Sequence, residues 1–113
     1  IDIVRGELET VKAERGEVRR AWREAKNEAR VAKFSEDADL TGEQTETLAE
    51  LMAEESESVR DLYRQARENY DFRGARSKHE EVKKATDERL ESVLDAEQLE
   101  LWKSVREERR RRY

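Results

Sequence analysis

The 113-residue sequence contains no proline and no cysteine, and only four of its residues are glycine. A chain so poor in proline and glycine lacks the residues that build tight hairpin turns, which argues against a β-sandwich or β-barrel. The absence of cysteine excludes disulfides, thiolate metal sites and cysteine nucleophiles. Alanine, glutamate, lysine, leucine and arginine supply more than half of the residues, a composition typical of long helices. The sequence therefore predicts an all-α protein.

Apolar residues are also scarce. They make up 35% of the sequence, whereas charged residues make up 47%, so only a narrow stripe of each helix can be buried. The length corresponds to one domain, and we expect residues 1–113 to form it. A small domain with so little apolar surface buries little of it alone, so we expect a homodimer. No run of 18 apolar residues occurs, so we expect no membrane insertion by this chain.

The heptad spacing of apolar residues is sustained from Ile3 to Phe34. It predicts a long helix over residues 3–33, with a coiled-coil seam that needs a partner surface. The segment from Ser35 to Asp39 has three acids and no periodicity, so it predicts a connection. One register of the seam holds Val4, Val11, Val18 and Ala25, and the other holds Leu8, Arg15, Trp22 and Ala29.

Two short motifs mark the starts of later helices. Thr41 can cap a helix while Gln44, three residues on, reaches back to the N–H of Thr41, which is the reciprocal arrangement of a capping box. Asp95 and Gln98 can do the same. Asn and Asp favour a turn at residues 69–71. Together with the apolar spacing, these signals predict helices over residues 42–69, 72–93 and 96–111.

The paired segments Leu40-Thr41-Gly42-Glu43-Gln44 and Leu94-Asp95-Ala96-Glu97-Gln98 resemble the LTxxQ motifs of the Spy/CpxP-like family, periplasmic helical proteins that include stress chaperones and heavy-metal sensors. The second copy departs from the motif by having Asp in place of Thr, a change that preserves the capping chemistry. The resemblance covers residues 40–112, and the first helix matches only by position and character. It implies an extended, bent helical hairpin that pairs antiparallel with a second subunit to form a cradle, and it implies a periplasmic location.

From this resemblance we expect an ATP-independent chaperone or envelope-stress accessory protein that holds unfolded or partner proteins on its cradle. Two alternatives stay open. One is a metal- or stress-responsive sensor or regulatory domain of the same family. The other is an unrelated coiled-coil adaptor that only self-associates.

Large side chains are the candidates for contacts with such partners. Aromatic residues at helical spacing are most often core or dimer interface. Tyr70 and Phe72 lie beside the predicted turn, so we expect them to stay partly exposed at a contact edge. The full candidate contact set is Tyr70, Phe72, Arg73, Trp22 and Trp102.

Charge is distributed unevenly along the chain. Nine acids and no base lie between Phe34 and Val59, whereas six bases and two acids lie between Lys103 and Arg112. Such runs can be solvated surface, or the basic tail can lie against the acidic half of the second helix. The net charge is −5 and most bases alternate with Glu, so we expect no nucleic-acid binding.

His79 is the only histidine in the chain. A metal site on one helix needs a second donor three or four residues away, but Arg76 and Lys83 stand among those neighbours. A site would need a carboxylate such as Glu55 from another helix, so we expect His79 to be a partly buried seam residue and predict no metal or other cofactor. No nucleophile adjoins His79 and no glycine-rich loop follows a strand, so we expect no enzymatic activity.

Overall fold

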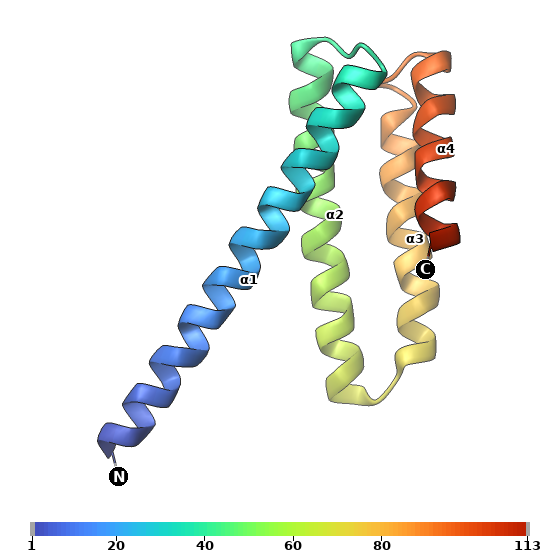
Figure 1. Ribbon diagram of the computed structural model, residues 1–113. Coiled ribbons are helices and arrows are strands. Elements are labelled where there is room, and N and C mark those ends of the chain that lie inside the picture. Colours follow the sequence, from blue (N-terminus) through green and yellow to red (C-terminus); the bar gives the residue numbers. More distant parts are fainter. Residues whose placement is uncertain (1, 113) are drawn as a thin grey trace.

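The computed structural model describes the backbone of residues 2–112 and the side chains of residues 14–112. Over this part of the chain it contains four α-helices and no strand, which confirms the all-α prediction. The helices α2 and α3 form an antiparallel hairpin, α4 runs beside α3, and α1 diverges from α2 toward its own N-terminus (Figure 1). The helices are α1 (Asp2–Asp37), α2 (Gly42–Asn69), α3 (Phe72–Leu90) and α4 (Ala96–Arg112).

The predicted bounds of the second helix are confirmed, and those of the others change at their ends. The α1 helix continues to Asp37, through most of the segment predicted as a connection, and the chain turns at Asp39 with a φ of 52°. The α3 helix ends at Leu90 rather than at residue 93, because the chain turns there and carries Leu94 into the core. The turn after α3 is closed by the N–H of Val93, which donates to the Leu90 carbonyl at 3.0 Å.

The turn predicted between the second and third helices lies where the sequence places it. Tyr70 adopts the left-handed conformation with a φ of 54°, and its N–H bonds back to the carbonyl of Ala66. Asp71 then caps α3, and its carboxylate accepts the N–H of Gly74 at 3.0 Å. The hairpin of α2 and α3 is therefore closed by local backbone chemistry.

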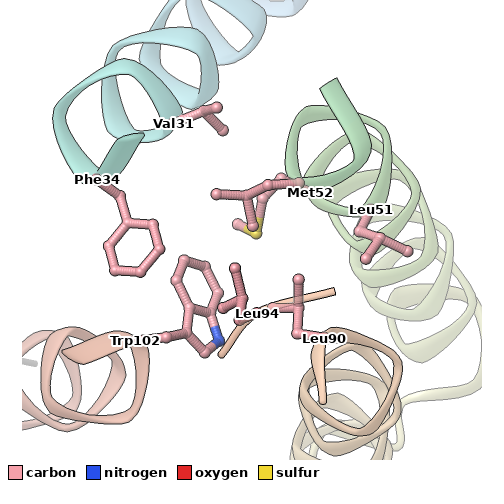
Figure 2. Close-up of a cluster of buried hydrophobic side chains, with 8 residues drawn as sticks. Val31, Phe34, Leu51, Met52, Leu90, Leu94 and Trp102 are labelled. Carbon is pink, nitrogen blue, oxygen red and sulfur yellow. The ribbon is translucent and has the colours of Figure 1, made fainter. Parts of the chain in front are cut away.

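The hydrophobic core lies at the end of the bundle where α1 leads into α2 and α3 leads into α4. Figure 2 shows Phe34 from α1 and Trp102 from α4 facing each other, with Met52 from α2 and Leu90 from α3 around them. The rings of Phe34 and Trp102 meet edge to face, with 5.1 Å between their centroids. All four helices contribute to this core. It therefore holds the first half of α2 and the end of α3 together with α1 and α4.

The remainder of α1 extends beyond this core, and the molecule is correspondingly elongated. Its extents are 61 × 31 × 24 Å and its radius of gyration is 17.4 Å, against about 13 Å for a compact domain of similar length. Val18 and Trp22 on this part of α1 are exposed to 69% and 63%. The middle of α1 thus presents two large apolar side chains that this chain leaves exposed.

Candidate protein-binding groove

Both sequence motifs form the capping boxes that they predict. The Gln44 N–H donates to the Thr41 hydroxyl at 3.2 Å, and the Thr41 N–H donates to the Gln44 Oε1 at 2.9 Å. The second motif repeats this exchange, with distances of 2.8 Å and 3.0 Å between Asp95 and Gln98. Replacing Thr with Asp in the second motif therefore leaves the capping geometry intact.

The two motif glutamines also bind each other. The Gln44 Nε2 donates to the Gln98 Oε1 at 2.9 Å and to the Val93 carbonyl at 2.9 Å. In return, the Gln98 Nε2 donates to the Ala38 carbonyl at 3.3 Å. Each glutamine thus caps its own helix and fastens the segment that precedes the other motif. We call Gln44 and Gln98 with these bonds the glutamine clasp; it holds the starts of α2 and α4 side by side.

A buried ion-pair cluster fixes α4 across the hairpin. The Arg106 guanidinium binds both carboxylate oxygens of Glu55, at 2.6 Å and 3.0 Å, and its Nε donates to Asp87 at 3.1 Å. Trp102 donates its Nε1–H to the same Asp87 oxygen at 2.8 Å. Burial alone would lower the pKa of Arg106, but Glu55 and then Asp87 raise it above its ordinary value. The cluster therefore joins α2, α3 and α4 through one fully charged guanidinium.

The sequence left open whether the basic C-terminal segment is solvated or lies against the acidic half of α2, and the structure shows the second arrangement at one residue. Arg106 of the basic segment does lie against Glu55 of the acidic half of α2, within one chain. Arg111 and Arg112 instead pair with Glu107 and Glu108 on their own helix and are solvated.

A groove of about 600 Å³ lies between α1 and α2 and extends to the start of α3. It opens because α1 diverges from α2, and the Asn27 Nδ2 bridges the two helices by donating to the Ser56 Oγ at 2.6 Å. Its apolar lining consists of Trp22 on α1, Val59 and Tyr63 on α2, and Phe72 on α3. Phe72 is 54% exposed, so an aromatic ring is available to an occupant.

The charged lining of this groove has one sign. It contains five cations and no acid, namely Arg23, Lys26, Arg30, Arg60 and Arg67. None of the five forms an ion pair within residues 14–112. Lys26 lies over the Trp22 ring, 4.9 Å from its centroid, as in a cation–π contact. In a chain with a net charge of −5, this cluster forms a local positive field beside apolar surface.

Crowding of cations continues from the groove toward α4. Burial lowers the pKa of the Arg109 guanidinium, and the charges of Arg30 on α1 and Arg106 on α4 lower it further. A second hollow between α1 and α2 shares Arg23 and Arg60 with the groove but also contains Glu24, Glu28 and Glu57. A charged lining of one sign is thus a property of the groove and not of the whole α1–α2 junction.

The sequence-predicted contact residues are divided by the structure. Trp22 and Phe72 line the groove. Tyr70 is 89% exposed at the turn, and Arg73 is exposed nearby, but neither lines the groove. Trp102 was wrongly included as a contact residue: it is only 2% exposed, because α4 turns this face of its helix onto Phe34 and the hairpin.

His79 is half-buried between α3 and α2, as expected for a seam residue. Its Nδ1 lies 3.0 Å from the Tyr63 hydroxyl, and burial lowers its pKa, followed by the charge of Lys83. Glu55, the carboxylate considered as its metal partner, is instead occupied by Arg106. Among the side chains that the structure describes, no three His, Asp or Glu residues are grouped as metal ligands.

Sequence reasoning missed the two arginines that α2 contributes to the groove, Arg60 and Arg67. They are seven residues apart and so lie on one helix face, a spacing that was readable. It also did not single out Arg106 within the basic segment, although its partner Glu55 is an acid on the buried face of α2.

No helix in residues 2–112 combines the length and apolar character needed to cross a membrane. No protein-family model, curated protein or solved structure matches this chain.

Proposed function

We propose that the protein binds unfolded or partly folded proteins, without ATP, in the groove between α1 and α2. The observation that carries this proposal is the cluster of five cations with no acid, set beside exposed aromatic surface. Such a surface offers apolar contact for exposed hydrophobic segments and electrostatic attraction for acidic ones.

The proposed mechanism is weak and reversible capture. The arginines and Lys26 steer an acidic segment toward the groove, since a field of one sign raises the encounter rate more than the affinity. Phe72 and Val59 then cover apolar side chains of the segment. Because the groove is open to solvent, it does not enclose the captured segment, which suits clients without fixed structure.

The groove and the paired motifs together support a wider proposal. We propose that the chain is a periplasmic stress-response protein of the LTxxQ type and that it acts as a homodimer whose two grooves form a cradle. The capping boxes at Thr41 and Asp95, linked by the glutamine clasp, give the motif residues a structural role that supports this proposal.

The test is suppression of aggregation, measured by light scattering, with reduced α-lactalbumin as an acidic client and reduced lysozyme as a basic one. We expect suppression of α-lactalbumin aggregation at near-equimolar ratios, weaker suppression of lysozyme aggregation, and loss of the difference at high salt. The Arg60→Glu/Arg67→Glu variant should lose most of the effect on α-lactalbumin.

The matched control is Arg76→Glu/Lys84→Glu, which makes the same change in net charge at exposed positions of α3 outside the groove. Phe72→Ser should weaken capture, and Tyr70→Ser, at an exposed aromatic beyond the groove, should not. Equal loss in both charge variants would show that net charge alone acts. No suppression by the wild-type protein in molar excess would remove the proposal.

A further inference from the structure

The α1 helix has a second face that this chain leaves uncovered. Asn27, Val31 and Phe34 turn toward α2 and the core. At about 100° per residue, the heptad seam lies on the opposite side of the helix. Within the described side chains, every seam member from Arg15 to Ala32 is exposed, namely Arg15, Val18, Trp22, Ala25, Ala29 and Ala32.

A long uncovered face of this kind is expected to pack against another polypeptide. Isolated helices are marginal in water, and most helical stability in proteins comes from packing of an amphipathic face. Gly16 lowers the intrinsic stability of α1 by about 1 kcal/mol relative to alanine. Because the core and Asn27 use the other side of α1, a partner on the seam would leave the core contacts in place. Trp22 and Lys26, at the edge of the seam, also line the groove, so a partner there would share these two residues with it.

Charges on the two flanks of the seam identify the partner. In the heptad register with Leu8, Arg15, Trp22 and Ala29 at position a, position e holds only bases and position g holds acids or alanine. Position e is Lys12, Arg19, Lys26 and Lys33, and position g is Glu7, Glu14, Ala21 and Glu28. One side of the seam is therefore basic along its length, and the other is largely acidic.

This arrangement distinguishes the two ways in which a second copy can pair. In a parallel coiled coil, position g of one helix meets position e of the next heptad on its partner. Glu14 then meets Arg19 of the other copy, and Glu28 meets Lys33. An antiparallel pair brings e against e and g against g, which places bases against bases and acids against acids.

We propose that two copies of this chain pair through a parallel, in-register coiled coil of α1. The arrangement departs from the antiparallel pairing that the family resemblance implies. Arg15 at position a is consistent with it, because a single charged residue there sets register at some cost in stability. Trp22 and Lys26 belong to both surfaces, but the proposal rests on the seam and its flanking charges and not on an occupant of the groove.

Disulfide cross-linking tests the orientation directly, since the chain has no cysteine of its own. The variants are Val18→Cys and Ala25→Cys, both at position d, each oxidised in a glutathione buffer. In a parallel dimer each cysteine meets its own counterpart, within the Cα separation of about 7 Å that a disulfide tolerates. Both variants should form covalent dimers rapidly. Ser77→Cys, exposed on α3, reports random collision.

Antiparallel pairing gives a different result. The two sites are about 10.5 Å apart along the helix at 1.5 Å per residue. If one of them lies at the dyad of an antiparallel pair, the counterparts of the other are about 21 Å apart. Cross-linking of one variant alone, or only between the two variants when mixed, would overturn the proposal in favour of antiparallel pairing. Cross-linking no faster than that of Ser77→Cys in both would overturn it in favour of no α1 pairing.

Charge exchange provides a second, independent measurement. Glu14→Lys/Glu28→Lys turns four interhelical pairs from attractive to repulsive, so sedimentation equilibrium should show a dimer at least about tenfold weaker. Adding Arg19→Glu and Lys33→Glu to the same chain restores opposite charges and should restore the affinity.

A control for net charge is Glu46→Lys/Glu50→Lys, at exposed positions of α2, which should leave the dimer unchanged. Failure of the four-residue exchange to recover the affinity would refute the parallel arrangement. Failure of the aggregation assay would leave this result untouched, because that assay probes arginines of the groove that the seam does not use.

Discussion

The buried ion pair of Arg106 allows a sharp test of how α4 is held. Arg106→Ala removes a guanidinium whose side chain is 14% exposed and leaves Glu55, 8% exposed, without its bidentate partner. A buried carboxylate without this partner has lost its hydration and has no opposite charge to compensate for it. The expected loss of stability is therefore about 3–5 kcal/mol. That is a large share of the roughly 5–15 kcal/mol typical of a domain.

A surface pair in the same molecule provides the control. Arg89 and Glu54 are joined at 2.6 Å, the same separation as between Arg106 and Glu55, but both side chains are 60% exposed. Arg89→Ala should therefore cost no more than about 1 kcal/mol. Distance and residue types match in the two pairs, and they differ in burial and in the further contacts of Arg106.

The assay is urea unfolding followed by circular dichroism, at one protein concentration because pairing of copies would shift apparent stability. The double variant Glu55→Leu/Arg106→Leu completes the comparison, since replacing both partners with apolar side chains should recover most of the loss. The reasoning is refuted if Arg106→Ala and Arg89→Ala cost the same, or if the double variant is as unstable as Arg106→Ala.

Four further outcomes follow from other parts of the molecule. Gln98→Ala should destabilise the protein by about 2–3 kcal/mol in the same urea assay, because it removes a buried amide from the clasp and from the second cap. The pKa of His79 is lowered from 6.5 in the folded state, so its contribution to stability is present above that pH and is lost on acidification. The melting temperature should fall less between pH 7.5 and 5.5 in His79→Gln than in the wild type. Gly16→Ala should stabilise α1 by up to about 1 kcal/mol, whereas Gly74→Ala should destabilise α3, because its Cβ would crowd the capping carboxylate of Asp71; thermal melts separate the two.

Local chemistry made the helices and their starts readable from the sequence. Thr41 and Gln44 form a capping box within four residues, so no knowledge of the rest of the chain was needed to predict it. The binding of Gln44 to Gln98 could not be predicted in the same way, because it joins residues 54 positions apart that only the packed core brings together.

Faces of helices were harder to assign than the helices themselves. Periodicity shows that Trp22 and Trp102 each lie on an apolar stripe, but it does not show which stripe the chain covers. The structure buries Trp102 and exposes Trp22, because α4 lies along the hairpin whereas α1 leaves it. Arg106 could not be identified as the arginine of the ion-pair cluster for a related reason. The segment contains several arginines, and the sequence alone does not show which of them is buried.

The glutamine clasp divides the chain into parts that differ in their stability against local opening. It joins residues 54 positions apart beside the core, so we expect it to open together with the core rather than by itself. Among the described side chains, those of α1 before Asn27 form no hydrogen bond or ion pair with another helix, and we expect these outer turns to open alone. In a hydrogen-exchange experiment the amides around Gln44 and Gln98 would follow global unfolding, while those of the outer turns would exchange early. These outer turns of α1 can therefore release one binding partner and bind another while the core stays folded.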